Sequence, residues 1–245
     1  MPNRIRLPVV WAVCLFSCGC ESEYGALHRL ADIIDSGQES PENAAWLKDL
    51  LHFIDHESAF VRSSAVRAIG EIYGGTEDER LASLCVTILA DKLDDYEETI
   101  VAQCAARALI KIGLPHGHPE TRVIETKLRN AAKDLIHYGA AWYAMDALSL
   151  IDNPSDETRD VLIECLNSVA ESDYQIWKDS VRKHAAAALA GFGSRAAVAL
   201  PDLKKALADT SDRSWARRVI TEAIETIEAC CEEEVGSSSS GSERR

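Results

Sequence analysis

The stretch VRKHAAAALAGFG, at residues 181–193, decides the fold. Its apolar and small residues are Val181, Ala185, Ala188, Leu189 and Phe192. This spacing places them on one stripe of an α-helix, and the alanines leave room for a neighbouring helix to approach closely. Gly193 follows, and a glycine can adopt the left-handed conformation that ends a helix. The stretch therefore predicts a buried helix that has a small-residue face and ends near Gly193.

The same template occurs four more times along the chain. The other copies are Val61, Ala65, Ala68, Ile69 and Ile72; Val101, Ala105, Ala108, Leu109 and Ile112; Ala140, Ala144, Ala147, Leu148 and Ile151; and Ala216, Ile220, Ala223, Ile224 and Ile227. Larger residues repeat it once more at Leu27, Leu30, Ala31 and Ile34, as expected for a helix that caps the end of a stack. One position of the template is occupied in turn by Leu30, Ala68, Ala108, Ala147, Ala188 and Ala223. By subtraction, consecutive members of this series are 38, 40, 39, 41 and 35 residues apart. A period near 40 is typical of two-helix solenoid units.

A second, outer helix is expected before each copy of the template. These outer helices are predicted at about 41–54, 79–93, 119–137, 154–171 and 195–208. Two of these helices begin with a cap residue followed by a proline, namely Ser40-Pro41 and Asn153-Pro154. Acidic residues follow in the first turn of each, which favours a helix start. We therefore expect an all-α fold, a right-handed α-α solenoid of about five two-helix units with an N-terminal cap helix.

Three segments carry a resemblance to a known family. They are VRSSAVRAIGEIYG at 61–74, the stretch at 181–193, and the pre-proline helix SRAAVALPDLKKALAD at 194–209. They resemble HEAT repeats and PBS-lyase-like HEAT repeats, and the resemblance covers about residues 24–231. It implies a solenoid whose inner helices line a concave surface, and it implies mostly protein-binding scaffolds with a few enzymes among them.

The resemblance also implies a ladder of arginines, each placed after the first residue of the inner-helix template and paired with acids in the preceding loop. The matching residues and their candidate partners are Arg62 with Asp55 or Glu57, Arg182 with Asp173 or Asp179, and Arg217 with Asp209 or Asp212. Ala102 and Ala141 occupy this position in the second and third units. We therefore expect those two units to hold together by apolar packing alone.

The first twenty residues differ from the rest of the chain. A basic start precedes an apolar run at 7–16 and then small residues, which is the layout of a secretory signal peptide. The junction before Cys20 resembles the lipobox of bacterial lipoproteins, in which the first mature residue is a lipidated cysteine. A cut before Cys18 is one alternative, and an ordinary cleaved signal is another. We expect a signal peptide at 1–19 and an exported protein of the cell envelope that is anchored by lipid on Cys20.

Charge and composition limit the partners of the mature chain. The formal net charge is -14, which argues against a nucleic-acid partner because such binding rests on Lys and Arg contacts to phosphate. The same charge disfavours an anionic membrane surface, so membrane contact is expected through the lipid anchor alone. Residues 20–231 are expected to form one HEAT-like repeat domain. Residues 232–245, with four serines between glycines, predict a disordered tail.

No metal or cofactor site is expected. His52 and His56 are four residues apart, and His116 and His118 share a loop with Glu120, but neither histidine pair has a third ligand at a characteristic spacing. Deoxyhypusine hydroxylase, which has similar repeats, binds iron through His-Glu pairs on inner helices. The equivalent positions here carry no such pair: Ser64-Ala65, Cys104-Ala105, Tyr143-Ala144, His184-Ala185 and Val219-Ile220.

The expected function is a non-enzymatic scaffold that binds an unidentified protein. The alternative is an accessory enzyme or chaperone of the bilin-lyase type that acts on a bound prosthetic group. On each inner helix a second stripe of residues lies on the face that does not carry the apolar template. In the second and third units this stripe supplies four candidate partner-binding residues: Arg107, Lys111, Trp142 and Leu150. For Trp142 the alternative is packing across the small residues Ala187 and Gly191.

Overall fold

The computed structural model describes residues 45–95, 99–114, 120–134, 138–168 and 175–239, with the single positions 25, 28, 32 and 117. Outer helices are α2 (Ala45–Ile54), α4 (Glu79–Asp91), α6 (Thr121–Lys133), α8 (Asp156–Ser168) and α10 (Leu200–Ala208). Inner helices are α3 (Ala59–Tyr73), α5 (Thr99–Ile112), α7 (Tyr138–Leu148), α9 (Gln175–Ala190) and α11 (Trp215–Ser239). Within the described residues, the 3-10 helices η1 (Lys92–Asp94) and η4 (Gly193–Ala199) lie in connections. The predicted all-α, HEAT-like solenoid is confirmed, whereas most of the expected cap helix at 27–34 lies outside the described residues.

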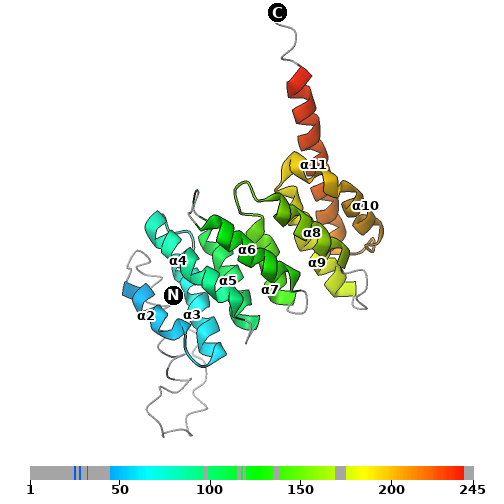
Figure 1. The fold of residues 1–245 in the computed structure, drawn as a ribbon. Coiled ribbons are helices and arrows are strands. Elements are labelled where there is room, and N and C mark those ends of the chain that lie inside the picture. The colour runs from blue at the N-terminus through cyan, green and yellow to red at the C-terminus, as the bar shows by residue number, and fades with distance from the viewer. Residues whose placement is uncertain are drawn as a thin grey trace, which may run out of the picture.

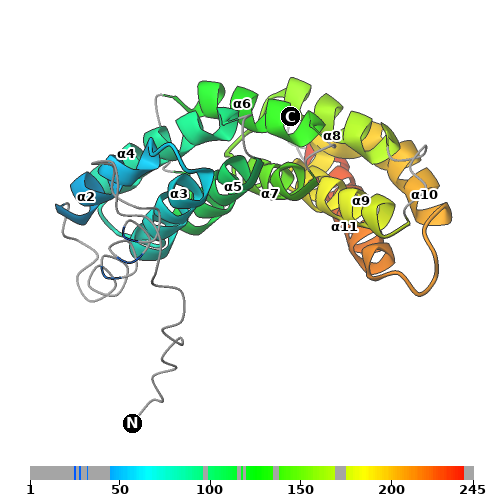
Figure 2. The ribbon, with the colours of Figure 1, turned by 90° about the horizontal axis from the view of Figure 1, so that it is seen from below.

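The helices stack into an arch (Figure 1). Seen from below, the outer helices α2, α4, α6, α8 and α10 form its convex side, and the inner helices α3, α5, α7, α9 and α11 form its concave side (Figure 2). Each inner helix contacts the inner helix of the next unit. The core is therefore a continuous layer between two rows of helices rather than a single centre.

The buried layer follows the inner-helix template. Its central alanines are at most 2% exposed: Ala68, Ala108, Ala147, Ala188 and Ala223. The outer helices contribute a matching buried column, which includes Cys85, Ile124 and Cys165. Each large apolar side chain removed from water in this layer contributes roughly 2 kcal/mol relative to its exposed state. The repeat is therefore held together by the residues that define it in the sequence.

Two helix boundaries differ from the sequence expectation. Asn153 does not cap α8; it has φ +49, and the Ser155 hydroxyl accepts the Thr158 backbone N–H at 3.3 Å instead. The expected outer helix at 195–208 is divided into η4 and α10, because Pro201 in the first turn of α10 lacks an N–H and disfavours an α-helical turn before it. Gly193 takes the left-handed conformation, with φ +56, as expected.

The last helix is longer than the sequence predicts. α11 continues to Ser239, into the segment 232–245 that was expected to be a disordered tail. Once a helix is nucleated, each further residue adds one backbone hydrogen bond, and the glutamates that follow Cys231 are good helix formers. The C-terminal part of α11 consequently extends away from the arch (Figure 1).

Candidate functional site

The inner helices form the concave face (Figure 2). On α3 the stripe includes Arg67 and Glu71, and on α5 it includes Arg107 and Lys111, all four of them exposed. Members of each pair are four residues apart, so they project from the same side of their helix. The template residues point into the buried layer, toward the outer helices and the neighbouring inner helices. At these four residues the stripe identified in the sequence is therefore accessible on the concave side.

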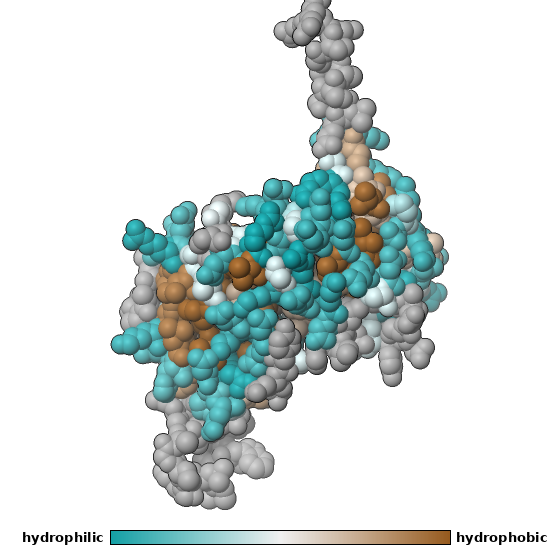
Figure 3. Space-filling model, viewed as in Figure 1, coloured by the Kyte–Doolittle hydropathy of each residue, from teal (hydrophilic) through white to brown (hydrophobic). Residues whose placement is uncertain are grey.

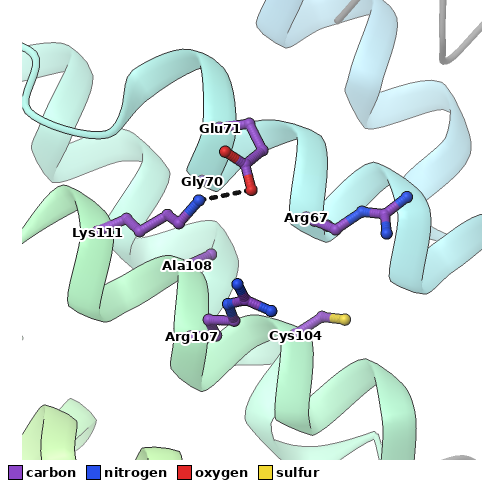
Figure 4. A pocket seen from close by; sticks show the side chains of 7 residues that line it. All are labelled: Arg67, Gly70, Glu71, Cys104, Arg107, Ala108 and Lys111. Atoms are coloured by element: carbon purple, nitrogen blue, oxygen red, sulfur yellow. Dashed lines mark ion pairs between the residues drawn. The ribbon is translucent and has the colours of Figure 1, made fainter. Parts of the chain in front are cut away.

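A shallow hollow with a cavity volume of about 20 Å³ opens between α3 and α5. It is lined by Arg67, Gly70, Glu71, Cys104, Arg107, Ala108 and Lys111 (Figure 4). Gly70 makes its floor possible, because a Cβ atom at this position would lie 2.7 Å from the Cβ of Ala108. The two helices approach so closely that only glycine fits without a shift. The sequence analysis missed Gly70 because it lies outside the apolar template, although a glycine inside a helix is itself a signal of close packing.

Three cations and one carboxylate surround this hollow. Lys111 Nζ and Glu71 Oε1 are 2.5 Å apart and form an ion pair across α3 and α5. The Arg107 guanidinium lies 6.0 Å from the centre of the Tyr143 ring, which is within cation-π range. Among the described residues no carboxylate lies within ion-pair distance of Arg67 or Arg107. The hollow therefore carries an excess of two positive charges in a chain whose net charge is -14.

The Cys104 thiol also faces this hollow (Figure 4). Burial raises the pKa of the Cys104 thiol, and the positive charges of Arg67 and Arg107 oppose part of this rise. The thiol is therefore a neutral, weakly polar part of the wall at neutral pH, since an ordinary thiol pKa already lies above 7.

An aromatic cluster connects α7 and α9, the next two inner helices after α5. The ring centroids of Trp142 and Trp177 are 5.2 Å apart, and Trp142 stacks on His184 at 5.8 Å with planes 7° apart. Nδ1 of His184 and Oδ1 of Asp146 are 2.6 Å apart. Trp142 packs against the core, and its Nε1 atom is buried with no hydrogen-bond partner in the described part of the chain.

The four candidate partner-binding residues thus fall into two groups. Arg107 and Lys111 lie together on the hollow, whereas Trp142 lies in the aromatic cluster, a geometry that favours the packing alternative. Its ring contacts, however, are to His184 and Trp177, which come earlier in the chain than the small residues expected to receive it. Leu150 lies in the turn after α7 and is 43% exposed.

Known proteins resemble this chain in its repeats and its fold. Residues 181–209, which cover most of α9 together with η4 and α10, match the family model of the PBS lyase HEAT-like repeat. This match supports a HEAT-like repeat protein. The crystal structure of an engineered protein from the Northeast Structural Genomics Consortium is similar with a TM-score of 0.58 and 20% identity, over 85% of this chain and 94% of that chain. No curated protein matches the chain.

The HEAT-type arginine of the first unit connects two loops. Arg62 Nε donates to Asp95 Oδ2 at 2.8 Å and Nη2 donates to Asp95 Oδ1 at 3.2 Å. Its Nη1 donates to the backbone carbonyls of His56 and Glu57, both at 3.0 Å. The acidic partner therefore comes from the following loop, and the preceding loop supplies carbonyl oxygens. Asp55, one of the acids expected to pair with Arg62, forms an ion pair with Lys92.

The other two arginines make different contacts. Arg182 donates to the backbone carbonyl of Asp209 at 3.4 Å and lies 3.6 Å from its carboxylate, again in the following loop. Asp179, an expected partner, accepts a hydrogen bond from Ser214 Oγ at 2.5 Å. Arg217 contacts the preceding loop, with Nη1 at 3.3 Å from Asp212 Oδ1. Asp173, the other expected partner of Arg182, lies outside the described residues.

A buried carboxylate joins the third and fourth units. Oε1 of Glu125 on α6, a residue only 1% exposed, accepts hydrogen bonds from the backbone N–H and hydroxyl of Ser155, both at 2.6 Å, and from the Thr158 hydroxyl at 2.5 Å. Arg122 Nη1 donates to Oε2 at 2.7 Å. Burial raises the pKa of Glu125, but the hydrogen bonds from Ser155, Thr158 and Arg122 outweigh it and lower the pKa to about 2.

Polar contacts also join the second and third units. Nζ of Lys127 on α6 lies 2.9 Å from the carboxylate of Asp91 and 3.0 Å from that of Asp94. The expectation that the middle units hold together by apolar packing alone is therefore wrong. Where Ala102 and Ala141 replace the ladder arginines, the outer helices supply the polar contacts between units.

Across the part of the chain that the structure describes, no three His, Cys, Asp or Glu side chains gather as a metal site would require. Within those ranges, no helix has both the length and the hydropathy needed to span a bilayer. Cys18 and Cys20 lie outside the described residues, so lipidation stays a prediction.

Proposed function

We propose that this HEAT-like repeat protein is a non-catalytic scaffold, held at a membrane of the cell envelope by lipid on Cys20, that binds a protein partner on its concave face. The observation that carries the proposal is the concave stripe itself, which runs along consecutive inner helices and has both charged and apolar exposed side chains. Solenoids commonly use such extended concave surfaces for binding. The repeat match and the arched fold support the scaffold role.

Exposed apolar residues stand at equivalent positions at the start of three inner helices. Phe60 on α3 is 60% exposed, Ile100 on α5 is 40% exposed and Trp215 on α11 is 50% exposed. The Lys183 ammonium lies 4.9 Å from the centre of the Trp215 ring. Aromatic residues near cations are enriched in protein interfaces. These residues would supply apolar contacts along one edge of the concave face.

The convex side offers the comparison surface. It is mainly hydrophilic, although hydrophobic residues gather at the end formed by α2, α3 and α4 (Figure 3). Leu84 on α4 and Val123 on α6 are 50% and 55% exposed. These two outer-helix residues match Trp215 and Phe60 in exposure, so they are suitable controls for substitutions on the concave face.

The test is capture of a partner from native envelope membranes by the tagged mature chain, followed by mass spectrometry. We expect Phe60→Ala and Trp215→Ala to reduce the yield of the captured protein at least fivefold, whereas Leu84→Ala and Val123→Ala leave it within twofold. Equal losses from both faces, or no specific capture, would contradict binding at the concave face. Visible absorbance in the purified protein would instead favour the bilin-lyase type of function.

A further inference from the structure

We propose, building on the proposed function, that the hollow between α3 and α5 binds a carboxylate side chain of the protein partner. The first observation is the pair of unpaired arginines, Arg67 and Arg107, which line one hollow from adjacent helices (Figure 4). The chain has 40 acidic and 26 basic residues, so carboxylates are abundant. Many of its other cations pair with them, as Lys92 and Lys127 do. The Arg67 guanidinium points away from that of Arg107 (Figure 4), but each carries a positive charge without a carboxylate partner among the described residues, and both charges would attract an incoming anion.

The second observation is the shape of the floor. Gly70 and Ala108 bring the two helix backbones together and leave open space above them. The Arg107 guanidinium points toward this space, and the Lys111-Glu71 pair lies beside it (Figure 4). A guanidinium presents a planar fork of N–H donors that matches the two oxygens of a carboxylate. The enclosed space of about 20 Å³ is small, so a carboxylate would sit at the open mouth of the hollow, within reach of these donors.

The third observation narrows the partner to a peptide segment. Phe60 and Ile100 precede Arg67 and Arg107 by seven residues on the same stripes, which is about 10 Å along an α-helix. Three residues of extended chain also span about 10 Å. A segment with an apolar residue three positions from a glutamate or aspartate could therefore contact both places. Nucleic acid fits less well, since a chain of net charge -14 repels a polyanion over its whole surface.

The first experiment measures fluorescence anisotropy of labelled octapeptides with the mature chain at low salt. The probe is a blocked peptide of two Leu-Gly-Gly-Glu units, and the matched control peptide has Gln in place of Glu. We expect the Glu peptide to bind at least tenfold more tightly than the Gln peptide. We expect Arg67→Ala and Arg107→Ala each to lower the affinity for the Glu peptide at least fivefold. Arg80→Ala, which removes an exposed arginine from the convex helix α4, should change its affinity by less than twofold.

Two further variants make the test sharper. Glu71→Gln removes the carboxylate that competes for Lys111, so it should tighten binding of the Glu peptide at least threefold. Arg107→Lys keeps the positive charge but loses the planar fork of donors. Its affinity for the Glu peptide should therefore lie between those of wild type and Arg107→Ala. Thermal melts by circular dichroism identify any variant whose loss of binding reflects unfolding, and Arg67 and Arg107 are both exposed enough for their variants to fold.

Several results would overturn the proposal. One is that the Glu peptide does not bind. Another is that Arg80→Ala weakens binding of the Glu peptide as much as Arg67→Ala and Arg107→Ala do. A third is that a dT oligonucleotide binds in preference to the peptide and depends on the same arginines. The capture experiment separates this proposal from the scaffold function. A partner that is lost with Phe60→Ala but retained at full yield with Arg67→Ala and Arg107→Ala would leave the concave-face function standing and would refute the carboxylate site.

Discussion

At the scale of single residues, Glu125 links the stability of the protein to pH. Its folded-state pKa of about 2 lies below the ordinary value of 4.5. A carboxyl group with a lowered pKa stabilises the fold above pH 4.5, and this contribution is lost as the pH falls from 4.5 toward 2. The loss amounts to roughly 3 kcal/mol, because each pKa unit corresponds to about 1.4 kcal/mol.

Urea unfolding of wild type and Glu125→Gln between pH 7 and pH 3 measures this link. The variant should be less stable at pH 7 by about 2 to 3 kcal/mol, and its stability should fall less steeply than that of wild type below pH 4.5. Glu157→Gln, which changes an exposed carboxylate at the start of α8, is the control. Identical pH profiles for wild type and Glu125→Gln would show that the network does not hold the carboxylate in its charged form.

Trp142 gives the second prediction at this scale. Because it stacks on His184 and Trp177 and contacts the core, Trp142→Ala should lower the free energy of unfolding by about 2 kcal/mol or more. Leu150→Ala, at a residue 43% exposed, should cost less than about 0.5 kcal/mol. Trp142→Ala with an unchanged urea midpoint but lost partner capture would restore recognition as its main role.

At the scale of helices and loops, Arg62 and Arg182 occupy the same repeat position but are held differently. Arg62 and Asp95 have side chains 10% and 12% exposed and hydrogen bonds as short as 2.8 Å. Arg182 meets a 52% exposed Asp209 carboxylate at 3.6 Å, and its Nε atom has no partner among the described residues. Removing Arg62 leaves a buried carboxylate uncompensated, which is the costlier loss.

We therefore expect Arg62→Ala to destabilise the protein by about 2 to 3 kcal/mol and Arg182→Ala by about 1 kcal/mol. Chemical denaturation of the two variants under identical conditions measures the difference. An equal or reversed order would mean that the loop between α4 and α5 does not depend on the Arg62 contact.

The sequence predicts the helices and their buried faces because both follow a local rule, the 3.6-residue spacing of apolar side chains. That rule places Ala68 and Ala108 in the core and Arg107 and Lys111 on the concave stripe. Polar partners follow no such rule. Asp95 reaches Arg62 across 33 residues, and Glu125 is buried because a loop at Ser155 folds over it. The hollow also depends on Gly70, whose effect appears only when α3 and α5 are packed together.

At the scale of the whole molecule, the proposed lipid on Cys20 would determine whether the protein is found with membranes. If Cys20 carries lipid, Cys20→Ala should move the protein from the membrane fraction to the soluble fraction, because an acidic surface offers anionic lipids no second attachment. Cys18→Ala is the matched control and should leave the protein on the membrane. Fractionation with fatty-acid labelling measures both, and a membrane-bound, unlabelled wild type would refute the lipid anchor.

The close contact of Gly70 with Ala108 has a consequence for the shape of the arch. At this contact the first two units form a wedge, because glycine and alanine meet between the inner helices α3 and α5 while leucine and cysteine are buried on the outer helix α4. The curvature between α3 and α5 is thus set by the small size of the two residues on the floor of the hollow. A few added methyl groups between α3 and α5 would flatten the arch and change which segments fit across it, with every exposed residue left as it is.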